Sequence, residues 1–167
     1  MKEEIAHLKG THQQKNLKNN AVISGIDAKN LNDTQIKDVV IAYGQKVNVQ
    51  LSSENFEAYK IRKNSERLKV CFKEFSIKNQ IMNTKKNVQM KEEDIGLTGN
   101  NYIFINQDLM PYIQELYKKV GDFKRKENYK FAWVDESGKM FLRKTETSKA
   151  IEVNSEDKLN KIQKEKN

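Results

Sequence analysis

The chain of 167 residues is long enough for one domain or two small ones, and 37% of it is hydrophobic against 32% charged. This polar composition still supplies a core, because aromatic residues reach 8%. The net charge of +8 at pH 7 fits an anionic partner, either nucleic acid or an acidic membrane surface, and it also fits a lysine-rich surface that only keeps the protein soluble.

Cysteine content and hydropathy exclude several protein classes. The only cysteine, Cys71, rules out a disulfide framework within the chain and a zinc site built on cysteine pairs. No apolar run approaches the roughly 20 residues of a transmembrane helix, and no signal segment follows Met1. We therefore expect a soluble, intracellular protein of the cytoplasm or the nucleus, without membrane contact.

The first part of the chain carries strand and helix patterns in the order β-α-β-β-α-β. Strands are predicted over residues 19–27, 54–63, 67–75 and 101–107, and helices over residues 33–47 and 75–86. The segment between residues 87 and 100 is polar and predicts a loop. This order predicts an α+β fold with an RRM-like (ferredoxin-like βαββαβ) domain over residues 19–107, in which two helices cover one face of an antiparallel sheet and leave the other face open.

A small C-terminal α/β domain, a helix plus a β-hairpin, is predicted over residues 108–154. Asp108 is the expected cap of the helix, and Gly121 its expected end. Residues 128–144 predict the hairpin, and residues 150–154 a further short strand. We expect residues 1–18 to be a short helical or disordered leader that is the remnant of a coiled coil, and residues 155–167 to be a short helix or a loose charged tail.

The third predicted strand, RLKVCFKEF, directs cations away from the core. Alternation places Arg67, Lys69 and Lys73 on the open face of the sheet. In the RNA-recognition motif, stacking aromatics occupy the positions of Arg67 and Lys69, and Val22 stands where another aromatic is found on the first strand. We therefore predict that this sheet lacks the stacking platform and binds phosphates instead, with little sequence preference.

The second strand ends in further predicted phosphate-binding cations, namely Lys60, Arg62 and Lys63. The alternative is that all these cations are solvated side chains that protect the edge of the sheet from pairing with other chains.

The segments NNAVISGI, RLKVCF, NYIFINQDLMP, ELYKKV and above all YKFAWVDESGKMFLRKTETSKAIEV resemble the baculovirus few-polyhedra (FP) protein family, C-terminal domain included. The layout is also similar to that of the first open-reading-frame protein of LINE-type retrotransposons. The resemblance implies a coiled coil, an RNA-recognition-like domain and a C-terminal domain that together bind single-stranded nucleic acid. The long coiled coil is nearly missing from this chain, which leaves a homo-oligomer through residues 1–18 open.

The resemblance also implies individual roles in the C-terminal domain. It assigns nucleic-acid binding to Lys130, Lys139, Arg143 and Lys144. Tyr129 and Trp133 are the aromatic candidates for stacking on bases. A single tryptophan between Phe131 and Val134 is, however, more typical of a core position.

We predict neither an enzyme nor a protein that depends on a cofactor or a metal. His7 and His12 lie in the leader and do not indicate a partner for Cys71 or a zinc site. The expected function is sequence-tolerant binding of single-stranded RNA or DNA. The alternative is a structural or assembly protein of a virion or ribonucleoprotein particle, for which the apolar pairs Ile5/Leu8 and Leu159/Ile162 offer protein contacts.

Overall fold

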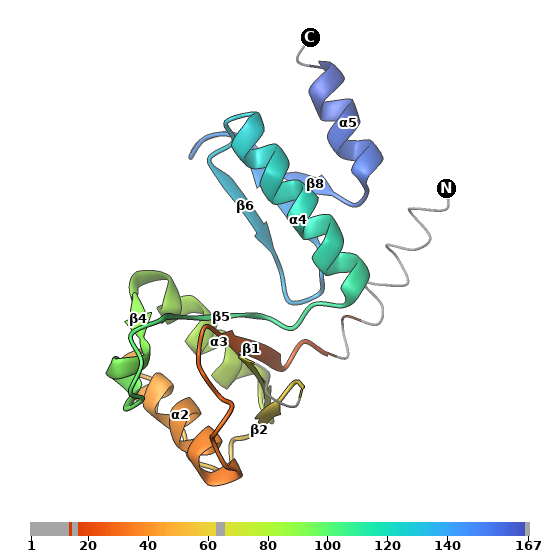
Figure 1. Ribbon diagram of the computed structural model, residues 1–167. Coiled ribbons are helices and arrows are strands. Elements are labelled where there is room, and N and C mark those ends of the chain that lie inside the picture. Colours follow the sequence, from red (N-terminus) through yellow and green to blue (C-terminus); the bar gives the residue numbers. More distant parts are fainter. Residues whose placement is uncertain (1–13, 15–16, 63–65, 166–167) are drawn as a thin grey trace. The chain divides into compact units, whose positions relative to one another are not determined.

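The computed structural model describes residue 14, residues 17–62 and residues 66–165 (Figure 1). These residues form two compact units. The N-terminal unit is Asn19–Asp108, and the C-terminal unit is built from Leu109 onward together with the described residues that precede Asn19. The predicted α+β class is confirmed, because each unit packs helices against an antiparallel sheet.

The N-terminal unit contains a five-stranded antiparallel sheet in the order β2-β3-β1-β5-β4. Its elements are β1 (Asn20–Ser24), α2 (Asp33–Lys46), β2 (Phe56–Lys60), β3 (Arg67–Phe72), α3 (Phe75–Thr84), β4 (Met90–Lys91) and β5 (Tyr102–Gln107). Strand β4 lies in the segment that the sequence predicts to be a loop, since two residues are too few to produce a periodic pattern.

Helix α2 begins at Asp33, the first residue of the helix predicted over residues 33–47. Asn32 is the N-cap, and its side chain accepts a hydrogen bond from the backbone N–H of Gln35, while the Gln35 side chain accepts one from the N–H of Asn32, both at 2.8 Å. This reciprocal pair satisfies two of the N–H groups that a helix start leaves open. The predicted apolar stripe of α2 is confirmed, because Ile36, Val39 and Tyr43 are buried in the core.

One face of the five-stranded sheet forms the core with α2 and α3. Leu68, Val70 and Phe72 of β3 lie in this core, as predicted, together with inward residues of β1, β2 and β5. The successive residues between them point to the opposite face, because side chains alternate along a strand. We call that opposite side the helix-free face; it belongs to the N-terminal unit alone.

Gly25 ends β1 with a φ of +90°, and a Cβ added there would lie 2.0 Å from the carbonyl oxygen of Tyr102 on β5. We expect Gly25→Ala to destabilise the protein by about 3 kcal/mol or more, because it combines left-handed backbone strain with a steric clash between two strands. Gly96→Ala is the matched control. Gly96 has a φ of +85° but nothing within 4 Å of an added Cβ, so it should cost only about 1–2 kcal/mol. If urea denaturation shows the same loss of stability for both variants, the steric clash does not contribute.

The C-terminal unit contains α4 (Pro111–Lys126), β6 (Phe131–Val134), β7 (Met140–Arg143), β8 (Ile151–Val153) and α5 (Glu156–Glu165). The three strands form an antiparallel sheet in the order β6-β7-β8, so the predicted hairpin is extended by the predicted short strand. Residues of α4 and α5 pack with one face of this sheet in a second core. The charged tail is thus a helix rather than a loose end as far as residue 165.

Both predicted ends of α4 are wrong. Met110 rather than Asp108 is the N-cap, and its backbone N–H donates to Oε1 of Gln14 at 2.7 Å. Gly121 lies inside the helix, because the buried stripe continues from Val120 to Phe123 and outweighs the roughly 1 kcal/mol that a glycine costs in a helix. The hairpin turn is as predicted, with Gly138 at a φ of +87°.

The predicted coiled-coil remnant lies almost wholly outside the described residues, as do Ile5 and Leu8. Leu159 and Ile162 are buried in the second core, where they dock α5, so this pair does not offer the protein contact expected of it. Within the part of the chain that the structure covers, no helix combines the length and the apolar character needed to cross a membrane.

Candidate functional site

The helix-free face brings together residues from four strands. The register pairs Tyr59 on β2 with Lys69 on β3, and Lys69 with Val22 on β1. One row further along, Arg67 on β3 is level with Ser24 on β1, and Ser24 is level with Phe104 on β5. Adjacent strands lie about 4.8 Å apart, so these rows present a band about 10–15 Å wide.

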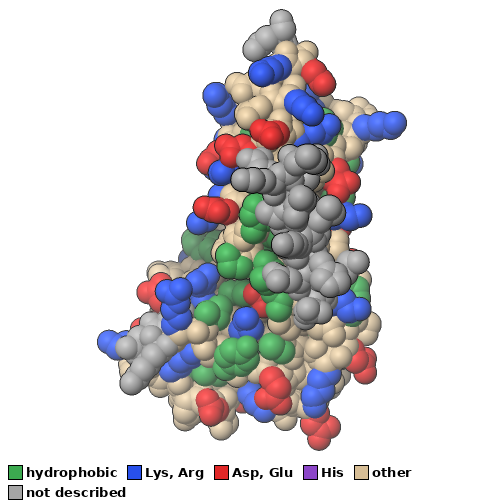
Figure 2. Space-filling model, turned by 90° about the vertical axis from the view of Figure 1, so that its right-hand side faces the viewer, with side chains coloured by type: hydrophobic (Ala, Val, Ile, Leu, Met, Phe, Trp, Pro, Cys, Tyr) green, Lys and Arg blue, Asp and Glu red, His purple; other side chains and the backbone are tan. Residues whose placement is uncertain are grey.

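This face carries exposed aromatic rings at positions other than those of Val22, Arg67 and Lys69, where the motif has its stacking aromatics. Tyr59 is 47% exposed, Tyr102 44% and Phe104 58%. They come from β2 and β5, whereas the sequence comparison considered only the first and third strands. The alternation in FEAYK and YIFINQ was sufficient to find them. Figure 2 shows, in its lower half, hydrophobic side chains gathered on the N-terminal unit with lysine and arginine side chains beside them.

The charge of Lys69 is largely compensated on this face. Its Nζ lies 3.2 Å from Oδ2 of Asp108, which also accepts a hydrogen bond from the Asn20 side chain at 3.2 Å. Desolvation lowers the pKa of Lys69, but its ion pair and hydrogen bond with Asp108 outweigh this effect and leave the pKa raised. Lys69 is therefore a cation held by an acidic partner, and it contributes less to phosphate attraction than the sequence predicts.

A thiol and a phenol stand beside this ion pair. Burial is the main cause that raises the pKa of the Cys71 thiol, and it also raises the pKa of the neighbouring Tyr59 hydroxyl. Both groups therefore stay protonated near neutral pH, and Tyr59 is present as a neutral phenol ring. Such a ring can stack on a base and donate a hydrogen bond.

Of the other predicted cations of the N-terminal unit, two lie on the helix-free face. Arg67 is exposed at the start of β3, and Lys73 is exposed where the ladder between β2 and β3 ends, with its N–H donating to the Asn55 carbonyl at 2.9 Å. Arg62 is exposed just beyond β2, and Lys63 lies outside the described residues.

Lys60 does not belong to the helix-free face. Alternation along β2 turns its side chain to the helix side, where Nζ donates to the Lys29 carbonyl at 3.1 Å. Two lysines near α3 are also engaged inside the unit. Lys78 is buried and donates to Gln107. Lys85 donates to the carbonyl of Ile105, and its pKa is lowered, mainly by burial.

The side of the C-terminal sheet that faces away from the second core carries aromatic rings around one arginine. Trp133 stacks on Phe141 with ring centroids 5.3 Å apart, and the guanidinium of Arg143 lies 4.5 Å from the centroid of Phe131 and 5.9 Å from that of Trp133. Trp133 is 37% exposed, so its expected place in the core is wrong. The Nε of Arg143 is buried without a hydrogen-bond partner among the described residues. Arg143 is thus held over rings rather than extended towards solvent.

The remaining predicted residues of this unit do not converge on one point. Tyr129 is buried against Phe123, at 5.6 Å between centroids, so its ring is not presented for stacking. Lys144 lies with Nζ 6.0 Å from the Tyr129 centroid. Lys139 is exposed at the turn, about 17 Å along the strand from Lys144 at about 3.4 Å per residue.

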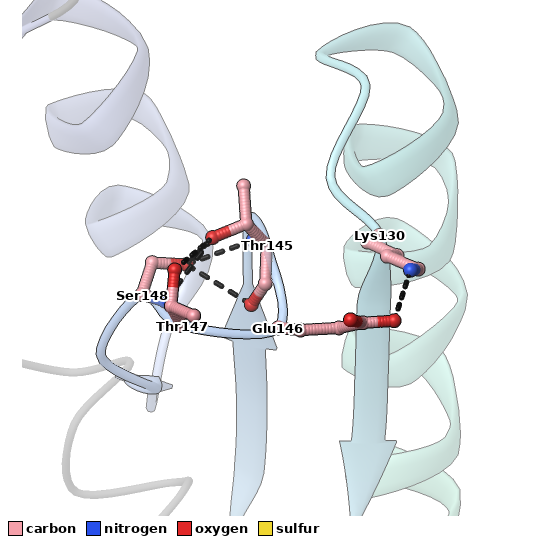
Figure 3. A network of polar contacts seen from close by, with 5 residues as sticks. All are labelled: Lys130, Thr145, Glu146, Thr147 and Ser148. Carbon is pink, nitrogen blue, oxygen red and sulfur yellow. Dashed lines mark hydrogen bonds and ion pairs between the residues drawn. The ribbon is translucent and has the colours of Figure 1, made fainter.

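Lys130 is paired with an acid rather than offered to a phosphate. Its ammonium forms an ion pair with Glu146 in the loop between β7 and β8 (Figure 3). The same loop is ordered by hydroxyl contacts, in which the N–H of Thr145 donates to Oγ of Ser148 at 2.8 Å and the N–H of Ser148 donates to Oγ1 of Thr145 at 3.1 Å. An exposed pair of this kind contributes little stability and can be exchanged for another anion.

No cluster of three histidine, cysteine or acidic side chains with metal-binding geometry occurs among the residues that the structure describes. His7 and His12 lie outside them.

Comparison with known proteins finds a family model that matches part of the chain. Residues 110–163 match the family model described as Baculovirus FP protein domain 2. This match confirms the resemblance for the segment that contains YKFAWVDESGKMFLRKTETSKAIEV, and it covers α4, β6, β7, β8 and most of α5. No curated protein matches the chain.

Proposed function

From the premise that residues 110–163 form a baculovirus FP protein domain 2, we propose that the chain binds single-stranded nucleic acid, with little sequence preference and without catalysis. The observation that carries this proposal is the coincidence of exposed rings and cations on one sheet face. Tyr59 on β2 and Phe104 on β5 lie on either side of β3 and β1, and β3 carries Arg67 and Lys69. Rings stack on any base, and cations follow the phosphate backbone, so the combination suits a single strand of any sequence.

We infer further that the N-terminal unit is an RNA-recognition-like domain. Support comes from the order β2-β3-β1-β5 and from the two helices on one face, which match the predicted βαββαβ unit. The rings stand on β2 and β5 rather than on the central strands β1 and β3. A strand of nucleic acid crossing this face therefore stacks at its two sides and meets cations in between.

The C-terminal unit contributes a second, weaker set of contacts in this proposal. Lys139 and Lys144 are exposed, and Trp133 presents part of its ring. Lys130 is available only if its pair with Glu146 opens, and Arg143 only if it leaves its place between the rings. We assign phosphate contacts here to Lys139 and Lys144 first.

The proposal is tested by a fluorescence-anisotropy titration with single-stranded oligonucleotides at two salt concentrations. Three to four phosphate contacts predict an affinity that falls roughly 20- to 50-fold between 50 mM and 200 mM salt. Homopolymers of different bases should bind within about tenfold of one another, because stacking tolerates every base. Absence of binding at low salt, or an affinity that does not change with salt concentration, would contradict the proposal.

A further inference from the structure

A shallow groove lies at the β4–β5 side of the N-terminal sheet, next to the most exposed ring of the unit. Its volume is about 320 Å³, and it is lined by Lys86, Val88, Gln89, Met90, Tyr102 and Phe104, among others. This size is at the small end of the roughly 300–1,000 Å³ that ligand sites span. The groove is formed because β4 is only two residues long and leaves the rest of β5 without a strand beside it.

The lining combines apolar and aromatic side chains with the polar side chains of Lys86 and Gln89. Val88 and Phe104 are exposed apolar side chains, and Tyr102 has the ammonium of Lys91 5.1 Å from its ring centroid. Lys86, which also lines the groove, is exposed. Because Lys91 already lies over the Tyr102 ring, Phe104 is the ring with the most surface free for a ligand.

The free edge of β5 is not prepared to receive another strand. The Lys85 ammonium donates to the Ile105 carbonyl, which occupies one of the edge acceptors that an added peptide strand would need. Lys85 also donates to the side chain of Asn106 at 3.3 Å. An occupant that uses ring stacking and phosphate contacts therefore fits the groove better than one that uses backbone pairing.

We propose that this groove holds one unpaired base of the bound strand, stacked on Phe104, with the adjoining phosphates contacted by Lys86 and Lys91. This assignment rests on the proposed function and specifies its base-holding position. The register supports a continuous path, since Phe104 is level with Ser24 and Arg67 on the neighbouring strands. A strand that leaves the groove thus meets the guanidinium of Arg67 about 10 Å further on.

The test compares two substitutions at one exposed position, so folding is not at risk. Phe104→Tyr keeps an aromatic ring, whereas Phe104→Leu keeps apolar surface without one. Each variant and the unmodified full chain are titrated with a short single-stranded oligonucleotide and with the same backbone carrying abasic sites. We expect Phe104→Leu to bind the normal oligonucleotide about tenfold more weakly and to lose most of the preference over the abasic strand. Phe104→Tyr should remain within about threefold of the unmodified protein.

The outcomes separate this inference from the function on which it rests. If the unmodified chain binds no oligonucleotide, the proposed function fails. If it binds, and Phe104→Leu matches it on both strands, the groove is not a base site and only this inference is overturned. If Phe104→Leu instead lowers the mass measured by light scattering while oligonucleotide affinity is unchanged, the occupant is a second copy of the chain, which also overturns it. Circular dichroism of each variant confirms that the fold is retained.

Discussion

Replacing Arg67 and Lys73 together by glutamate is expected to weaken the binding of single-stranded oligonucleotides about 100-fold at low salt. Both side chains are exposed on β3 or directly after it, on the helix-free face. Each charge-assisted phosphate contact is worth on the order of 1.5 kcal/mol or more, and glutamate adds repulsion. The loss of two contacts should also reduce the slope of log affinity against log salt by about 1.4.

The control for this variant is Lys118→Glu combined with Lys161→Glu. Those two lysines are exposed on α4 and α5 in the C-terminal unit, and the substitutions lower the net charge by the same amount. We expect this control to lose less than about fivefold in affinity, because only long-range attraction is reduced. Equal losses in the two variants would mean that the protein attracts nucleic acid by net charge alone and that the helix-free face has no special role.

Lys69 is not substituted in this variant because it forms an ion pair with Asp108. Lys69→Ala would remove the partner of Asp108, whose side chain is only 10% exposed, and would leave an uncompensated carboxylate beside the face. A loss of binding in that variant would therefore mix lost attraction, new repulsion and a structural change. No local sequence pattern predicts this ion pair. Lys69 and Asp108 come close because β3 and β5 are the two neighbours of β1 in the sheet, and Asp108 directly follows β5.

Local patterns predicted most of the fold. The alternation in RLKVCF correctly separates buried Leu68 and Val70 from exposed Arg67, because the side-chain period of a strand depends only on neighbouring residues. The prediction that α4 ends at Gly121 is wrong because the helix end depends on a contact that is distant in the sequence. A glycine signals a stop locally, but burial of Phe123 against the second core keeps the helix intact.

The candidate site was predicted less well than the scaffold. The motif consensus covers only the first and third strands, so it does not find Tyr59 on β2 or Phe104 on β5, although the alternation of both strands places these rings on the helix-free face. Lys60 is predicted to bind phosphates, but the alternation of β2 places it with Phe56 and Ala58 on the helix side of the sheet. Which cations have acidic partners depends on strand order and loop position, and neither is contained in a local pattern.

Phe56→Ala is expected to destabilise the protein by about 3–5 kcal/mol. Phe56 is fully buried on β2, and its ring lies 6.3 Å from that of Phe72 between centroids. Truncation removes this contact and leaves a cavity under the sheet. Since native stability is typically about 5–15 kcal/mol, the urea midpoint should fall markedly.

Tyr59→Ala, on the same strand three residues later, is the matched control for this loss. Its ring stands on the helix-free face and is 47% exposed, so truncation should cost less than about 1 kcal/mol of stability while weakening oligonucleotide binding by about tenfold. Phe56→Ala should therefore lower stability, whereas Tyr59→Ala should lower the affinity for oligonucleotides. These different effects are expected only if Phe56 and Tyr59 lie on opposite faces of β2. If Tyr59→Ala instead unfolds the protein as Phe56→Ala does, the ring of Tyr59 is part of a packed interior, and the helix-free face is not the surface on which a nucleic-acid strand can stack.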